Sequence, residues 1–163
     1  MIAMIWAQDQ NGLIGNSKTN QLPWPKMSED LNYLKEVTTG QIVVMGRKTF
    51  ESLPNGPLKN RINVVLTSQN LKSDVLIINK IDEIKEIEKE NPNHDIFILG
   101  GIHVYQGAIP FAQRFYRTTI DGNFEGDLYM PEINYKLYKK ISTKDVLSSK
   151  GYKLTFEVFD KID

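Results

Sequence analysis

The sequence contains no cysteine among its 163 residues and only two histidines, His94 and His103. The lack of cysteine excludes disulfide bonds, thiol nucleophiles, thiolate metal sites and haem attachment. With so few histidines we also expect no catalytic metal. Twenty Lys and Arg residues balance twenty Asp and Glu residues. This net charge of zero predicts neither nucleic acid nor an anionic membrane surface as a partner.

Long hydrophobic runs are missing as well, since no apolar run approaches the roughly 18 residues that a membrane span needs. Residues 1–7 are apolar, but no basic segment precedes them and no small-residue cleavage site follows them, which is unlike a signal peptide. Apolar residues make up 40% of the chain and charged residues 25%, which predicts a folded core. We expect one cytoplasmic domain over residues 1–163, and a monomer because no coiled-coil repeat is present.

Short apolar runs rich in β-branched residues recur between helix-like stretches, at residues 42–45, 62–66, 75–78 and 96–99. Strands that are apolar on both faces are typical of a largely parallel sheet covered by helices on both sides. Start and stop signals predict helical segments over residues 29–37 with Ser28 as the cap, 49–53, 82–90, and from after Gly101 to about residue 109.

The last third of the chain alternates without long helices, over residues 114–120, 138–146 and 152–159. This alternation favours antiparallel strands at one edge. The predicted fold class is therefore α/β, a single domain with a mixed, mostly parallel eight-stranded sheet, about four flanking helices and an antiparallel C-terminal edge.

Residues 9–27 follow no clean period and are rich in Gly, Asn, Gln, Ser and Pro. A loop of that length within a compact domain is uncommon unless it works on a ligand. The alternative is a surface excursion that the fold merely tolerates.

The helix after this loop carries the most informative carboxylate. Met27, Leu31 and Leu34 follow a 3,4 spacing that predicts a buried stripe, and Asp30 falls on it. The residues expected to point elsewhere are Glu29, Tyr33 and Glu36. A carboxylate that faces an apolar interior is a functional candidate with a raised pKa. The alternative is that Asp30 only supports the first helical turn and faces water.

Two strand ends run through glycine into a helix, at residues 45–49 and 99–105. Free backbone N–H groups and the positive helix end favour a phosphate there, although Gly-Arg-Lys-Thr also occurs as an ordinary solvated turn. The G-x-G-x-x-G fingerprint is absent, so the common dinucleotide fold is not supported.

The strand over residues 62–66 is followed by Thr67-Ser68-Gln69 with no acid, which favours NADP over NAD. Three strand ends are thus expected at one crevice. His103 could be a donor at its rim or only a surface histidine, and His94 is assigned to a loop.

Several short elements occur in an order and spacing that resemble bacterial chromosomal dihydrofolate reductase, and they cover most of the chain: residues 5–8, 12–15, 22–24, 30–31, 44–52, 61–66, 99–101 and 124–127. The resemblance implies that the chain uses NADPH to reduce 7,8-dihydrofolate to 5,6,7,8-tetrahydrofolate for one-carbon metabolism. It also implies that the chain binds antifolate inhibitors.

Site residues follow from the same resemblance. Asp30 is similar to the acid that binds the pterin ring and promotes its protonation, with Trp24, Leu22 and Thr118 as further catalytic residues and Glu29 as the competing assignment. The implied substrate-binding residues are Ile5, Trp6, Ala7, Asp30, Leu31, Leu34, Ser52, Leu53, Leu58, Arg61, Leu99, Tyr105 and Thr118. The implied cofactor-binding residues are Ala7, Ile14, Gly15, Asn20, Gln21, Gly46, Arg47, Lys48, Thr49, Leu66, Thr67, Ser68, Gln69, Gly100, Gly101, Ile102, His103, Val104 and Tyr105.

The resemblance further implies that residues 9–27 form a mobile active-site loop and that the Gly100–Gly101 peptide bond is cis. Ile102 and His103 depart from common versions of the family, which have a third glycine and a basic residue there. Two alternatives stay open: a riboflavin-pathway reductase of the same fold, and a non-catalytic protein that binds NADP or antifolates.

Overall fold

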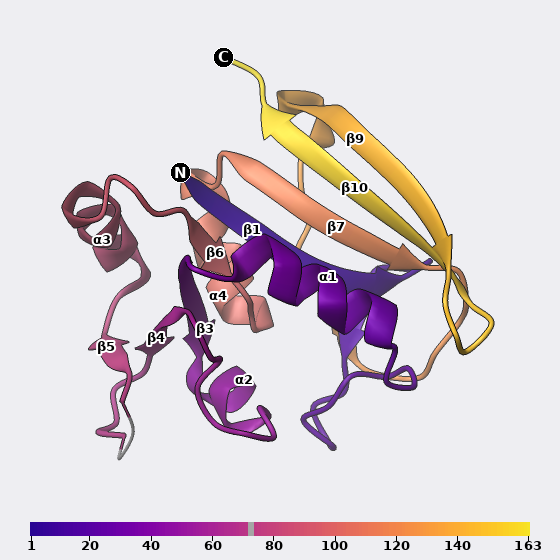
Figure 1. The fold of residues 1–163 in the computed structure, drawn as a ribbon, viewed down its shortest axis with the longest axis horizontal. Helices are drawn as coiled ribbons and strands as arrows, with labels where there is room; N and C mark the ends of the chain where they lie inside the picture. The colour runs from indigo at the N-terminus through magenta and orange to yellow at the C-terminus, as the bar shows by residue number, and fades with distance from the viewer. Residues whose placement is uncertain (72–73) are drawn as a thin grey trace.

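The computed structural model describes residues 1–71 and 74–163. Its main sheet has eight strands in the order β5-β4-β3-β6-β1-β7-β10-β9, drawn in Figure 1. The strands of this sheet are β1 (Ile2–Asp9), β3 (Ile42–Gly46), β4 (Ile62–Leu66), β5 (Leu76–Ile78), β6 (Ile96–Ile98), β7 (Arg114–Ile120), β9 (Tyr138–Leu147) and β10 (Lys153–Lys161). The pairs from β5 to β7 are parallel, whereas β10 pairs antiparallel with both β7 and β9. The predicted fold class is confirmed.

Within the described residues there are four α-helices and three short 3-10 helices. They are α1 (Ser28–Thr38), α2 (Arg47–Glu51), η1 (Ile81–Glu83), α3 (Ile84–Glu90), α4 (Ile102–Ala108), η2 (Ile109–Phe111) and η3 (Tyr135–Leu137). Figure 1 shows α1 across the front of the sheet and α4 behind it. A separate two-stranded sheet pairs β2 (Leu13–Gly15) with β8 (Leu128–Tyr129).

Alternation along the central strands divides the core between the two faces of the sheet. On one face, Ala3, Ile5, Val43 and Met45 pack with side chains of α1 and α2. We call this the α1 face. On the other face, residues such as Met4, Val44 and Ile98 pack with α3 and α4, and we call it the α4 face. Both faces are apolar, which explains why these strands appear as unbroken hydrophobic runs.

Several predicted boundaries differ from the structure. Ser28 does not cap α1, because it is the first helical residue and Met27 holds the N-cap position without a side-chain hydrogen bond. Acidic Glu29 and Asp30 in the first turn complement the helix dipole instead. The turn predicted at 49–53 begins two residues earlier, directly after β3.

Two ends of predicted helices are 3-10 helix in the structure. Residues 81–83 precede α3 as η1, and the chain continues through Pro110 as η2 after α4. Proline is tolerated there because the first turn of a helix has no partner for its missing N–H.

Candidate active site

Asp30 lies in the first turn of α1 and is half-buried. Burial raises the pKa of its carboxyl from 3.8 to about 6, and a hydrogen bond with the Thr118 side chain opposes that rise. Thr118 is buried on β7, where it pairs with Ala7 of β1. Thr118, in a central strand of the sheet, is therefore a fixed hydrogen-bond partner for the Asp30 carboxyl on α1.

Glu29, the competing acid, has a different environment. Its carboxylate accepts the backbone N–H of Ser149 at 3.0 Å, in the turn before β10. Hydrogen bonds with its own backbone and with Ser149 lower the pKa of Glu29. Glu29 thus ties α1 to the C-terminal hairpin, and Asp30 is the one of the two acids with a desolvated carboxyl.

The buried stripe of α1 differs from the predicted one. Leu31 is 38% exposed, whereas Tyr33, expected to point away, packs on Phe156 with ring centroids 4.3 Å apart. Leu34 packs on the α1 face as expected. A 3,4 spacing fits more than one line of residues along this helix. The packing of Tyr33 against β10 shows that the buried stripe runs through Met27, Asp30, Tyr33 and Leu34 and leaves out Leu31.

The predicted apolar lining is divided between the two faces. Side chains on the α1 face are those of Ile5, Leu34, Leu53, Leu58 and Leu99. Ala7 packs with the cluster around Trp24 at the start of α1.

Trp6 and Tyr105, in contrast, lie on the α4 face. The Trp6 ring packs against those of Tyr105 and Phe115, with centroids 6.1 and 5.6 Å away. The prediction grouped Trp6 with its neighbours, but adjacent residues of a strand point to opposite faces. The side chain of Trp6 is therefore not on the α1 face with Asp30.

Tyr105 nevertheless connects the two faces. Its hydroxyl donates to the Ile5 carbonyl at 2.9 Å. Burial raises the pKa of Tyr105, and the charge of Asp30 adds to the effect. The Tyr105 hydroxyl is thus a neutral hydrogen-bond donor. It lies close enough to Asp30, on the other face of the sheet, for the carboxylate charge to raise its pKa.

Arg61 lies beside the opposite end of α1 from Asp30. Its Nη1 donates to Thr38 Oγ1 at 3.0 Å, and its Nε donates to the Lys59 carbonyl at 2.9 Å. Thr38 in turn donates to the Leu34 carbonyl at 2.7 Å. Eight residues of helix separate Asp30 from Thr38, which is about 12 Å along the axis. The Asp30 carboxyl and the Arg61 guanidinium therefore lie near opposite ends of α1.

The ends of β3 and β6 meet as expected. The Gly46 N–H donates to the Gly100 carbonyl at 2.8 Å, and the Gly100–Gly101 bond is cis. Gly100 has a φ of 117°, and a Cβ there would lie 3.1 Å from the Tyr105 ring. A Cβ on Gly46 would lie 3.2 Å from Val104. Side chains at these two positions would therefore crowd Val104 and Tyr105, which explains why glycine stands where the two strands run into helices.

The side chains around this junction suit an anionic group. Neither α2 nor α4 has a side-chain cap hydrogen bond, so their first N–H groups are open to a ligand. Arg47 is half-buried and pairs with Glu51 at 2.7 Å. The exposed members of the predicted cofactor set here are Lys48, Ser68, Gln69 and His103. The half-buried and buried members are Thr49, Leu66, Thr67, Ile102 and Val104.

The irregular loop is held by hydrogen bonds to α2 and to the segment before β8, and by one bridge within the loop itself. Asn20 Nδ2 donates to the Lys48 carbonyl at 2.9 Å, and Asn16 bridges to Gln21. Ser17 hydrogen-bonds the Asp127 carboxylate through both its N–H, at 2.8 Å, and its hydroxyl. Directly after these contacts in the sequence, Leu22 is 51% exposed. The loop thus lies next to α2 with one large apolar side chain free.

Asp9 was predicted only as the start of the loop, and in the structure it is a buried carboxylate. It is 1% exposed and accepts the backbone N–H groups of Asn11 at 2.8 Å, Leu13 at 3.0 Å and Phe124 at 3.2 Å. It therefore joins the loop to the segment before β8. An acid at the end of an apolar strand, followed by Asn-Gly, is the sequence signal that could have identified it.

Comparison with known proteins decides the family. The family model described as dihydrofolate reductase matches residues 1–161. The chain belongs to the dihydrofolate reductase family. It is 37% identical to dihydrofolate reductase of Bacillus subtilis over 167 aligned residues, covering 99% of this chain and 95% of that one. It is 36% identical to the Enterococcus faecium enzyme, with coverage of 86% and 84%.

A solved structure supports the same assignment to the dihydrofolate reductase family. The structure of dihydrofolate reductase from Enterococcus faecalis, complexed with NADP(H) and RAB-propyl, is similar with a TM-score of 0.88 and 34% identity. The match covers 100% of this chain and 97% of that one. At this identity and coverage the likeness extends to the whole fold.

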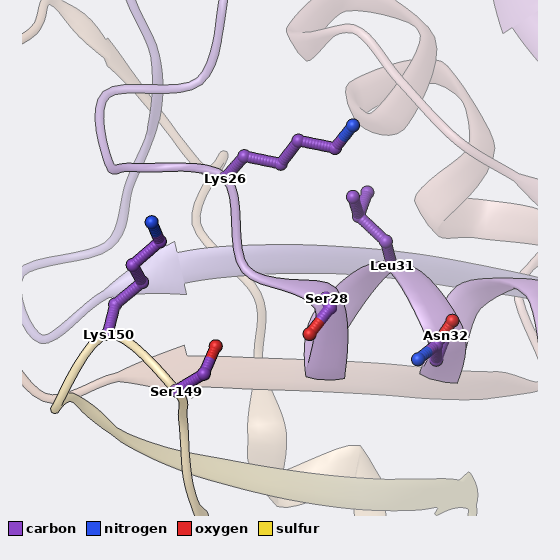
Figure 2. A pocket seen from close by; sticks show the side chains of 6 residues that line it. All are labelled: Lys26, Ser28, Leu31, Asn32, Ser149 and Lys150. Carbon is purple, nitrogen blue, oxygen red and sulfur yellow. The ribbon is translucent and has the colours of Figure 1, made fainter.

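A hollow lies at the start of α1, as Figure 2 shows. Its lining is Lys26, Ser28, Leu31, Asn32, Ser149 and Lys150. Leu31 is the only member of the predicted site in that lining, so the hollow itself is not that site. Among residues 1–71 and 74–163, no three His, Asp or Glu side chains gather as metal ligands. No helix in this part of the chain is long and apolar enough to cross a membrane.

Proposed function

We propose that this protein reduces 7,8-dihydrofolate to 5,6,7,8-tetrahydrofolate with NADPH on the α1 face around Asp30. The observation that carries the proposal is a single half-buried carboxyl with a pKa of about 6, held by Thr118, in a chain of the dihydrofolate reductase family. Reduction of an imine needs a hydride at carbon and a proton at the neighbouring nitrogen. An acid that titrates near neutral pH suits the second requirement.

The residues at the ends of β3, β4 and β6 fit NADPH. The helices α2 and α4 begin after Gly46 and Gly101 without side-chain caps, which suits pyrophosphate oxygens. Arg47, Ser68 and His103 offer cationic and hydroxyl groups for a 2′-phosphate, with no acid in the Thr67-Ser68-Gln69 turn. When bound, NADPH supplies the hydride. The described structure of the Enterococcus faecalis relative with NADP(H) supports this assignment.

Asp30 has the central role in orienting the pterin. Its carboxylate can accept hydrogen bonds from the amino-pyrimidine edge of the ring, and Thr118 holds one carboxyl oxygen. At neutral pH most Asp30 is ionised, so the proton reaches the pterin nitrogen through a bound water that the acid polarises. Trp24 is buried against Phe124, with ring centroids 5.9 Å apart, and supports the start of α1. Leu22 in the loop is available to exclude water.

Arg61 is proposed to bind the α-carboxylate of the glutamate tail. Thr38 and the Lys59 carbonyl use two of its five N–H donors, so a fork remains for a carboxylate. Leu53 and Leu58 pack on the α1 face and would contact the benzoyl group. All residues in these roles come from one copy of the chain, so we propose that a monomer is sufficient. Antifolates would bind the same face.

The test is loss of nicotinamide absorbance when purified protein is mixed with NADPH and dihydrofolate. We expect oxidation of NADPH only when dihydrofolate is present, and much slower turnover with NADH. No turnover with both ligands saturating would refute the proposed reaction and favour a non-catalytic binding protein.

A further inference from the structure

Asn63 is a polar residue on an apolar face of the sheet. It lies in β4, and because side chains alternate along a strand it shares the α1 face with Val65. Asn63 is only 6% exposed. A buried amide is unfavourable unless its polar atoms are hydrogen-bonded, so its partners show what it does for the fold.

All three partners of Asn63 belong to the loop that precedes β4. Asn63 Oδ1 accepts the Leu58 N–H at 2.9 Å. Nδ2 donates to the carbonyls of Leu58 at 2.9 Å and Arg61 at 3.1 Å. Both amide donors are used, and a flipped amide would set N–H against N–H at Leu58. One side chain thus fixes the backbone at both ends of residues 58–61.

This loop carries two of the residues proposed to contact the distal half of the substrate, Leu58 and Arg61. Between them, Asn60 has a φ of 61°, and its carbonyl accepts the Gly40 N–H at 2.7 Å. The guanidinium of Arg61 also bonds the loop itself, through the Lys59 carbonyl. The direction of the guanidinium therefore depends on the backbone that Asn63 holds.

We propose that Asn63 is a positioning residue for the tail of dihydrofolate, acting through Leu58 and Arg61 without touching the substrate. This inference rests on the proposed function. Asn63 would determine selectivity for the glutamate-bearing substrate over a bare dihydropterin, because only the former reaches the 58–61 loop. The pterin end, at Asp30 and Thr118, has no hydrogen bond to Asn63.

The decisive variant is Asn63→Asp, which keeps an acceptor for Leu58 but loses both donors and faces two carbonyls. We expect KM for dihydrofolate to rise about tenfold, the effect of losing a buried hydrogen bond. We expect KM and kcat for 6-methyl-7,8-dihydropterin to stay within about twofold, since that substrate lacks the tail. The matched control is Asn93→Asp, an exposed asparagine with no proposed role in binding either ligand, which should change the kinetics with neither substrate.

Two further measurements separate positioning from damage to the fold. NADPH affinity, measured by quenching of tryptophan fluorescence, should be unchanged in Asn63→Asp because the strand ends that would bind it are intact. If Asn63→Asp does not fold, Asn63→Ser replaces it, since a hydroxyl can keep one loop bond, and a smaller shift in the same substrate ratio is expected. In an Arg61→Leu background, Asn63→Asp should lose most of its effect on KM.

The outcomes distinguish the two proposals. If the wild-type protein reduces neither substrate, the proposed function is wrong. If the wild-type protein is active but the Asn63 variants lower activity equally on both substrates, or act fully in the Arg61→Leu background, the positioning role of Asn63 is wrong.

Discussion

Asp30→Asn is expected to stabilise the folded protein at neutral pH. Folding raises the pKa of Asp30 from 3.8 to about 6, chiefly because the carboxylate loses contact with water. Between these two values the unfolded chain has released the proton and the folded chain retains it, so raising the pH favours unfolding. The loss of stability is complete above about pH 6 and absent below 3.8.

The magnitude follows from the size of the change in pKa. A rise from 3.8 to about 6 corresponds to about 3 kcal/mol of unfolding free energy. Asparagine carries no charge and can still accept from Thr118. The advantage of Asp30→Asn over the wild type should therefore grow by up to about 3 kcal/mol between acidic and neutral pH, or about 6 to 12 °C in Tm.

Urea unfolding followed by circular dichroism at a series of pH values measures this difference. The control is Glu29→Gln, because the pKa of Glu29 is lowered and its hydrogen bonds stabilise the folded chain above pH 4.5. Relative to the wild type, Glu29→Gln should therefore lose stability as the pH rises. An advantage of Asp30→Asn that stays flat or shrinks with rising pH would contradict a desolvated carboxyl at this position.

Activity measurements on Asp30→Asn and Glu29→Gln, and two further substitutions, test the remaining roles. Asp30→Asn should lower kcat by about 10² or more and Glu29→Gln should leave it nearly unchanged; steady-state kinetics giving the reverse order would reassign the acid. Arg61→Leu should raise KM for dihydrofolate by about 10-fold or more but not KM for a pterin without glutamate, and equal increases would remove Arg61 from tail binding. Asp9→Asn should cost about 1 to 3 kcal/mol in urea unfolding because its new N–H₂ group faces the Phe124 N–H, whereas a neutral result would mean that Asp9 does not join the two segments.

The sequence predicted the sheet well because burial on both faces leaves a direct pattern. Runs such as 42–45 and 62–66 contain little but apolar β-branched residues, and they became β3 and β4 within one residue at each end. The strand predicted at 114–120 coincides with β7. Helix ends were harder to predict, since Ser28 is a good cap by type but no geometry in the sequence shows where its hydroxyl points.

Side-chain placement in the site was only partly predictable. Asp30 was chosen correctly as the desolvated acid, yet Leu31 and Tyr33 exchanged the surroundings expected of them. That exchange depends on Phe156, which is far away in sequence. Asp9 has a local signal, an acid before Asn-Gly at the end of an apolar strand, but its contact with the Phe124 N–H is distant in sequence. The hydrogen bonds of Asn63 to Leu58 and Arg61 are local, but its burial depends on the packing of β4. Residue type identifies candidates, whereas tertiary packing decides which of them share a face.

The strand order of the main sheet also has a consequence for the time course of folding. β1 lies between β6 and β7, so its partners are residues 96–98 and 114–120, about a hundred positions later in synthesis. An emerging nascent chain therefore exposes the apolar β1 while most of the protein is still to be made, and the central sheet cannot close until β7 has left the ribosome. For that interval the apolar side chains and backbone groups of β1 have neither of their strand partners.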